Sequence, residues 1–465
     1  MRPLEFAGFV LAILPALALL SVIPRWAGIA AAAISCAVLV AAAMWLGAYW
    51  QLVPLYAATA IGMIGLLWLS GPRAWMRGTL AAAILCLLVS TTAFAYILPM
   101  FRLPKPTGPY KVGTCIVHLV DPARIETHVS GPPQVRQIMV QIWYPASPDG
   151  QRLASYRRRR ETTLLSSYMD VLWTHSYKDA PVAASTNPFP VLIFNPAWQG
   201  QRTQNTYQTE DLASHGFIVA GIDHTYNSGP VAFPDGRVIW TDGIHDITDF
   251  DHTTVAQQIA IGDHEVRIEA GDDILALDYL SAAASNPSSP WFRRVDADDA
   301  GAFGHSFGGA VAGQTCYQDS RVKAAINEDG WMFGDVATHG LDKPFLVMYE
   351  DPSNSASEGR RESTLDSIDA SNVHRGLRQF GGYMVTILGT RHFNFADRSL
   401  YSPLRRLTDS GKISPQRAQA IVENYTLQFF SHYLKGKPAP LLAAIQSPYK
   451  EVQFENWYRH DALTR

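Results

Sequence analysis

A serine between closely spaced glycines carries the clearest chemical signal in this chain of 465 residues. Residues 302–309 read AFGHSFGG and contain the pattern G-x-S-x-G around Ser306. Such a serine lies on a strained turn between a strand and a helix, and its hydroxyl projects from the carboxyl edge of a sheet. The glycines are needed because a side chain at either position would collide with the neighbouring strand or helix. We therefore predict that Ser306 is a nucleophile.

A serine hydroxyl is a weak nucleophile at neutral pH and needs a histidine base that is oriented by a carboxylate. In this arrangement the chain order is serine, acid, histidine. Four histidines follow the serine before the C-terminal tail: His339, His374, His392 and His432. His392 comes just after a predicted strand at 383–388, which places it at the carboxyl edge of the sheet. Two of the others fall in predicted loops and His432 in a predicted helix, so we predict His392 as the base.

The acid has two sets of candidates, each following a predicted strand. Glu328 and Asp329 follow the strand at 322–326, whereas Glu350 and Asp351 follow the strand that ends at Tyr349. Many hydrolases of this kind carry the acid after the later strand, so spacing slightly favours the second pair. The residues alone leave both sets open.

The chain beyond residue 110 alternates between predicted strands and helices. Strands are expected at 111–120, 137–144, 190–194, 216–222, 299–303, 322–326, 344–349 and 383–388. One helix is expected to end at 211–215, and others are expected at 254–282, directly after Ser306 and at 416–434. This alternation predicts a mostly parallel sheet with helices on both faces. Together with the serine turn, it indicates an α/β-hydrolase domain at 111–465.

The first hundred residues differ sharply from the rest, with only five charged side chains. Apolar runs cover residues 6–23, 27–49, 52–69 and 79–100, each about long enough to cross a bilayer. We predict a four-helix transmembrane domain at 1–101 and a proline-rich linker at 102–110. Basic residues lie on both sides of these spans, with Arg25, Arg73 and Arg77 in the hairpin loops. Their distribution slightly favours cytoplasmic hairpin loops and an extracytoplasmic catalytic domain.

Composition and charge limit the classes of partner and ligand that this protein is expected to bind. The net charge of −3 gives no reason to expect nucleic acid, and no histidine–carboxylate cluster has metal-ligand spacing. The basic run at 157–160 fits either a solvated face or contact with anionic head groups. Cys115 and Cys316 do not reveal a redox compartment, and the oligomeric state is left open.

Five segments of the chain are together similar to the plasma-type platelet-activating factor acetylhydrolases. They are residues 108–113 (GPYKVG), 211–220 (DLASHGFIVA), 304–309 (GHSFGG), 329–333 (DGWMF) and 392–397 (HFNFAD). The resemblance extends over residues 108–435, with the segments in the same order. In that family the acid is the aspartate of the D-x-W-M-F segment, which implies Asp329, with Asp351 as the runner-up.

The resemblance also implies an oxyanion hole built from two backbone N–H groups. One belongs to Phe307, directly after the nucleophile. The other comes from the loop after the strand at 190–194, where the family has S-H-G-L-G. This chain has NPAWQ at 195–199 instead, so Trp198 would supply the second donor.

These expectations combine into a membrane-anchored serine esterase without a cofactor. The resemblance implies hydrolysis of the sn-2 short or oxidised acyl ester of a glycerophospholipid through an acyl-enzyme. Alternatives are a carboxylesterase that acts on other small or polymeric esters, an enzyme that transfers the acyl group to an acceptor other than water, and an inactive hydrolase-fold membrane scaffold.

Overall fold

The computed structural model describes residues 1–68, 74–129, 131–241, 253–353 and 364–458, and the chain divides into two compact units. Unit 1 comprises Met1–Arg102 together with two later segments, Ser155–Trp173 and Leu400–Leu404. Unit 2 comprises Leu103–Ala154, Thr174–Ser399 and Arg405–Arg465. The main division, between residues 102 and 103, falls within the predicted linker at 102–110. Nothing in the sequence indicated that two later segments would group with the first hundred residues.

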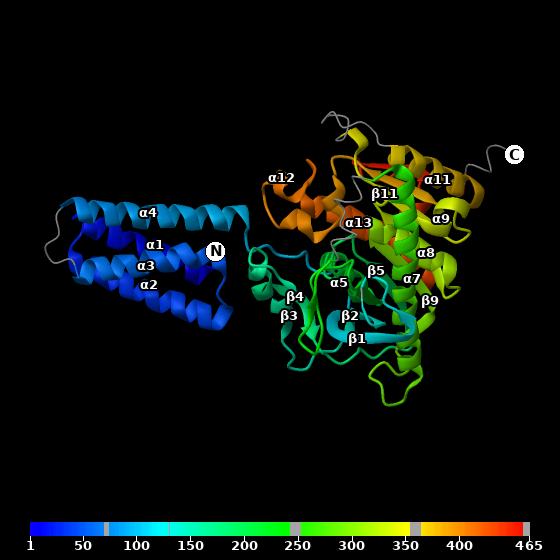
Figure 1. The fold of residues 1–465 in the computed structure, drawn as a ribbon, viewed down its shortest axis with the longest axis horizontal. Helices are drawn as coiled ribbons and strands as arrows, with labels where there is room; N and C mark the ends of the chain where they lie inside the picture. Colours follow the sequence, from blue (N-terminus) through cyan, green and yellow to red (C-terminus); the bar gives the residue numbers. More distant parts are fainter. Residues whose placement is uncertain (69–73, 130, 242–252, 354–363, 459–465) are drawn as a thin grey trace. The chain divides into compact units, whose positions relative to one another are not determined.

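Four apolar helices form the body of unit 1 (Figure 1). They are α1 (Pro3–Leu19), α2 (Arg25–Leu46), α3 (Val53–Trp68) and α4 (Ala74–Ile97). Three helical stretches, Arg25–Leu46, Trp50–Trp68 and Ala74–Ile97, are long and apolar enough to cross a membrane, whereas α1 has 17 residues. The four predicted helices are therefore present, and three of them have the length and composition of membrane spans. The loop that carries Arg73 lies outside the described residues.

Small residues let these helices approach closely. A Cβ atom added at Gly28 would lie 2.4 Å from the Cβ of Ala18, and one at Gly62 would lie 2.6 Å from Pro15. Close approach of backbones at glycine and alanine is the usual way in which apolar helices pack together in lipid. The remaining surface of the helices is apolar as well, with exposed side chains such as Trp45 and Trp68.

An eleven-stranded sheet forms the centre of unit 2. Its order is β13-β12-β11-β10-β9-β5-β6-β2-β1-β4-β3. The strands are β1 (Lys111–Ile125), β2 (Val135–Ala146), β3 (Leu153–Ser155), β4 (Trp173–Lys178), β5 (Phe189–Asn195), β6 (Ile218–Asp223), β9 (Val295–His305), β10 (Val322–Glu328), β11 (Phe345–Tyr349), β12 (Tyr383–Ile387) and β13 (Val452–Asn456). Strands β6, β5, β9, β10, β11 and β12 run parallel, while β2 and β13 pair antiparallel with their neighbours. A small hairpin, β7 (Val231–Ala232) and β8 (Val238–Ile239), lies outside this sheet.

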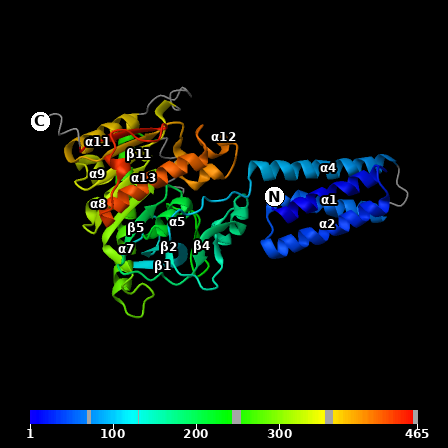
Figure 2. The ribbon, with the colours of Figure 1, turned by 180° about the vertical axis from the view of Figure 1, so that it is seen from behind.

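Helices cover both faces of the sheet. The main ones are α5 (Thr206–Ser214), α7 (Val255–Ser285), α8 (Phe307–Gln318), α9 (Gly334–His339), α11 (Thr364–Phe380) and α13 (Pro415–Lys435), with short helices α12 (Arg405–Thr408) and α14 (Pro440–Ala443). Helices α7 and α8 pack together on one face and appear in front of the sheet in Figure 1. Helices α5 and α13 pack together on the other face, which is turned toward the viewer in Figure 2.

Burial explains why the parallel strands form the core. Every residue of β5 and of β6 is buried, because helices cover both faces at this point. The α/β-hydrolase fold predicted from the sequence is therefore confirmed, including its mostly parallel sheet.

Two local predictions are wrong: His339 ends α9 and His374 lies within α11, so neither is in a loop. Cys115 and Cys316 are both free.

Candidate active site

Ser306 lies at the junction of β9 and α8 in a conformation that side chains rarely adopt. Its φ and ψ are 57° and −127°. Its N–H donates to the carbonyl of Glu328 on the neighbouring strand at 2.8 Å, which fixes the turn against β10. Strain of this kind persists only where the surroundings hold it, and it gathers at functional sites.

The glycines on either side of Ser306 are sterically required. A Cβ atom at Gly304 would lie 2.2 Å from the carbonyl oxygen of Gly308. One at Gly308 would lie 2.2 Å from the carbonyl oxygen of Asn195, at the end of β5. These distances are far inside van der Waals contact with backbone atoms that cannot swing away. The spacing of G-x-S-x-G thus follows from how tightly β9, β5 and α8 meet.

His392 and Asp329 form a direct pair at the same edge of the sheet. His392 begins a short 3-10 helix, η5 (His392–Phe395), after β12, and Asp329 follows β10. Nδ1 of His392 lies 2.7 Å from Oδ2 of Asp329. The other oxygen of Asp329 accepts the backbone N–H of Glu350 at 2.8 Å. Both oxygens of this carboxylate are therefore used, and the imidazole is held through Nδ1.

His392 packs against the residue that precedes the serine. The ring of His392 packs against the ring of His305, the residue before Ser306, with 4.5 Å between the ring centroids. No hydrogen bond joins Ser306 Oγ to the imidazole in the part of the chain that the structure describes. Catalytic hydrogen bonds are often long in unliganded enzymes and shorten when the substrate binds.

The other carboxylates that the sequence offered are engaged elsewhere. Asp351 accepts the backbone N–H groups of Gly389 and Ser353, at 2.8 and 2.9 Å. Glu328 is fully buried and accepts from the side chains of Gln208 and Asn205. Burial raises the pKa of Glu328 to about 8. Asp329 is thus the carboxylate that is bonded to His392.

The charges around His392 favour its protonated form. Burial lowers the pKa of the imidazole, but the hydrogen bond and the charge of Asp329, helped by Glu350, raise it further, so the net shift is upward. Burial and the neighbouring charge of Asp329 also raise the pKa of Glu350 to about 7. A base in this setting holds its proton well once it has taken it, as an imidazolium formed during acyl transfer must.

The two residues expected at the oxyanion hole lie side by side. Phe307 is the first residue of α8, and Trp198 lies in the loop after β5. Their rings meet edge to face, with 4.8 Å between the centroids. In the same loop the N–H of Ala197 donates to the side chain of Gln204 at 3.0 Å, so this amide is already used inside the protein.

Apolar side chains extend the site beyond these two rings. Phe307 packs on Phe333, and both belong to a buried cluster with Val266 and Leu365. Trp198 packs against the same cluster. The side chains packed around Phe307 are therefore apolar, and three of them are aromatic with Phe307 included.

Sequence reasoning missed the buried residues that connect these parts. His305 is completely buried and bonds to Gln204 and to the backbone of His392. The only signal for His305 was its place inside the serine motif. For Gln204 there was none, because its partner His305 lies 101 positions away in the chain.

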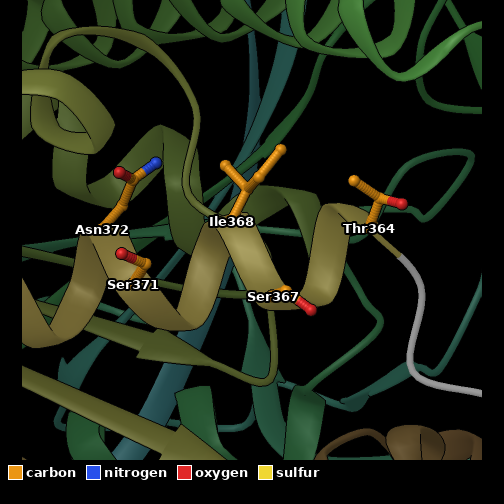
Figure 3. Close-up of a pocket in the computed structure, with 5 residues that line it drawn as sticks. All are labelled: Thr364, Ser367, Ile368, Ser371 and Asn372. Carbon is orange, nitrogen blue, oxygen red and sulfur yellow. The ribbon is translucent and has the colours of Figure 1, made fainter.

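A surface hollow of about 460 Å³ lies away from these residues, along α11. Figure 3 shows its lining, which comes from one helix: Thr364, Ser367, Ile368, Ser371 and Asn372. These side chains offer hydroxyl and amide groups but no base beside a nucleophile. None of the predicted site residues belongs to it.

Comparison with known proteins gives the family. A model of the family "Platelet-activating factor acetylhydrolase, isoform II" matches residues 97–234 and 292–438. A probable 1-alkyl-2-acetylglycerophosphocholine esterase of Arthroderma benhamiae is 25% identical over 80% of this chain and 98% of its own. The platelet-activating factor acetylhydrolase of Cavia porcellus is 23% identical over 71% of this chain and 78% of its own.

A solved structure is similar as well. The ferulic acid esterase from Streptomyces cinnamoneus shares 30% identity and a TM-score of 0.61, covering 76% of this chain and 99% of that one. The family match covers more than half of the chain, and its two segments include Trp198, Ser306, Asp329 and His392. The predicted family and the predicted class of ester hydrolase are thereby confirmed: the chain belongs to the platelet-activating factor acetylhydrolase, isoform II family.

Proposed function

We propose that this protein is a membrane-anchored serine esterase that hydrolyses the sn-2 short or oxidised acyl ester of glycerophospholipids. The observation that carries the proposal is the Asp329–His392 pair, 2.7 Å apart, beside the strained turn of Ser306. The names of the family and of its curated relatives point to the same substrate class.

In the first half of the reaction, Ser306 Oγ attacks the carbonyl carbon of the ester. Nε2 of His392 takes the hydroxyl proton, while Asp329 holds the opposite nitrogen and stabilises the imidazolium. The oxyanion is received by the backbone N–H groups of Phe307 and Trp198. His392 then gives its proton to the leaving lysophospholipid oxygen, and the acyl group remains on the serine.

In the second half a water molecule takes the place of the leaving alcohol. His392 removes its proton, the water oxygen attacks the acyl carbon, and Ser306 regains its proton as the carboxylic acid departs. Every step uses side chains and amides of this chain, and the reaction as written needs no cofactor.

The membrane part of the proposal rests on unit 1. Three of its helical stretches have the length and composition of spans, and the basic run at 157–160 belongs to the same compact unit. Leu164 and Leu165, just after this run, are 80% and 64% exposed. Arginines beside exposed leucines are typical of a surface that meets anionic head groups and acyl chains. We place the catalytic domain on the extracytoplasmic side, which reporter fusions after residue 102 and in the first hairpin loop would test.

The direct test compares Ser306→Ala with Ser320→Ala, a control at an exposed serine after α8. We expect Ser306→Ala to lose fluorophosphonate labelling and hydrolysis of 2-acetyl glycerophosphocholine, whereas the control keeps both. A Ser306→Ala protein with full activity would overturn the mechanism. A folded unmodified protein that is not labelled would instead favour an inactive scaffold.

A second candidate function is an esterase for other acyl groups, including aromatic ones. The packed aromatic rings of Trp198, Phe307 and Phe333 favour it, as does the similarity to a ferulic acid esterase. Values of kcat/KM for 2-acetyl glycerophosphocholine, p-nitrophenyl acetate and methyl ferulate would rank the two. A clear preference for methyl ferulate would displace the phospholipid proposal and leave the serine mechanism intact.

A further inference from the structure

The side chain of Gln204 connects two walls of the candidate active site. Its Oε1 accepts the backbone N–H of Ala197 at 3.0 Å, next to Trp198 in the oxyanion loop. Its Nε2 lies 2.6 Å from Nδ1 of His305, next to the nucleophile. The side chain is buried, so neither bond competes with bulk water.

The ring of His305 continues the connection to the catalytic histidine. Its Nε2 lies 2.8 Å from the backbone carbonyl oxygen of His392. His305 is completely buried, and its ring also stacks on Phe395, at 6.2 Å between the centroids. One hydrogen-bonded path therefore runs from the oxyanion loop through Gln204 and His305 to the main chain of His392.

Donors and acceptors along this path are consistent with only one assignment. The carbonyl of His392 can only accept, so Nε2 of His305 carries a proton. The N–H of Ala197 can only donate, so the amide oxygen of Gln204 faces it and the NH₂ group faces His305. Nδ1 of His305 is then the acceptor, and the ring is neutral. Burial lowers the pKa of His305 well below its ordinary value, and the charge of His392 acts in the same direction.

The loop is shaped around the glutamine. The N–H of Gly200 donates to the carbonyl of Ala197 at 2.6 Å, which closes a tight turn. A Cβ atom at Gly200 would lie 2.1 Å from Oε1 of Gln204, so glycine leaves the space that the amide occupies. The backbone N–H of Gln204 donates to Gln201, and its carbonyl accepts from Asp397. Both backbone polar groups of Gln204 are thus hydrogen-bonded, which fixes its main chain.

We propose that Gln204 and His305 are positioning residues that hold the oxyanion loop and the catalytic histidine in register with each other. This inference rests on the proposed serine mechanism and adds to it a physical link between two parts that act in the same transition state. Neither residue exchanges protons with the substrate. A small misplacement of either part lowers the rate of the chemical step much more than it weakens binding.

The first test is a double-mutant cycle with shape-conserving replacements, Gln204→Met and His305→Phe. Each breaks the path, and we expect each to lower kcat about 10- to 100-fold while KM changes little. Because both break the same path, the double variant should lose little more than the worse single variant. Losses that multiply, or that appear mainly in KM, would overturn the proposal. Thermal unfolding of each variant shows whether a loss of rate only reflects a loss of folded protein.

The second test uses Gln204→Glu, which keeps the shape of the side chain but cannot donate as a carboxylate. The bond to His305 then requires one extra proton on the Glu–His pair. We therefore expect kcat to gain a descending limb as the pH rises, which the unmodified protein lacks. The ionisable groups that face His305 are His392, Glu328 beside it on β10, Asp329 through His392, and Asp397 next to the backbone of residue 204.

Gln416→Glu, the same change at an exposed position on α13, is the control and should keep the unmodified profile. An unchanged pH profile in Gln204→Glu would overturn the proposal. The labelling rate of Ser306 by a fluorophosphonate separates this failure from that of the proposed function. An unmodified protein that neither turns over nor is labelled would overturn both, whereas normal labelling with independent losses would overturn only the positioning role.

Discussion

Two neighbouring turns at the carboxyl edge of the sheet carry the same residue type and use it differently. One follows β10 and carries Asp329; the other follows β11 and carries Asp351. The carboxylate of Asp329 binds the imidazole of His392, whereas that of Asp351 accepts two backbone N–H groups. One aspartate faces the site, and the other fastens the turn after β12.

The difference originates in the backbone. Asp329 has a φ of 60°, a left-handed conformation that costs free energy in a residue other than glycine. Its N–H is fixed by the carbonyl of Met348, and the turn lies against the nucleophile turn at Gly330. Asp351 has no such constraint. Asp329 and Asp351 share their residue type and their position after a strand. Their different roles are therefore decided by the conformation of each turn and by the position of η5, which carries His392.

Replacing each aspartate by asparagine tests this contrast most strongly. Asp329→Asn should lower kcat by about 10⁴-fold, because an amide cannot fix the required tautomer or stabilise the imidazolium. Asp351→Asn should lower it less than about tenfold, since an amide oxygen can still accept one of the two N–H groups. Steady-state kinetics of the two variants measure the contrast. Equal losses would mean that the two turns do not differ in function.

A smaller effect is expected from the contact between the acid turn and the nucleophile turn. A Cβ atom at Gly330 would lie 1.9 Å from the carbonyl oxygen of Ser306, so Gly330→Ala must push the two turns apart. We expect a loss of about 2 kcal/mol or more in the free energy of unfolding and a clear fall in kcat. Gly150→Ala is the control, because no atom lies within 4 Å of the Cβ added at Gly150; its φ of 77° is left-handed, whereas that of Gly330 is not.

The control variant should lose only about 1 kcal/mol, from backbone strain alone, with kcat unchanged. Chemical denaturation followed by fluorescence gives both values. If Gly330→Ala were no more destabilised than Gly150→Ala, the close approach of the two turns would not matter for stability.

The same contrast shows what the sequence could and could not reveal. Ser306 and the strands around it were predictable, because glycine spacing and apolar runs are local signals of backbone conformation. Spacing along the sequence slightly favoured the acid after β11, because spacing carries no information about the positive φ of Asp329. Only the resemblance to a family favoured Asp329. The roles of Gln204 and His305 could not be predicted for a related reason, since these residues bond to partners 101 and 87 positions away.

Unit 1 gives a second example of this limit. Its helices follow from composition, because long uncharged apolar runs have few alternatives to helix. The grouping of Ser155–Trp173 and Leu400–Leu404 with these helices does not follow. Contacts between segments far apart in the chain produce no periodicity or bias in composition from which they could be predicted.

The smallest effect concerns Glu350, which belongs to the second turn but touches the first through its backbone. Its charge raises the pKa of His392, more than the charge of Asp409 does. His392 must be neutral to act as a base, so removing the charge in Glu350→Gln should lower the pKa and move the acid limb of kcat/KM to lower pH. The Glu350 carboxyl has its own pKa raised to about 7, so its influence is greatest above that pH. Asp409→Asn should shift the limb in the same direction by less, and the reverse order in measured pH profiles would show that the second turn has no special influence on the base.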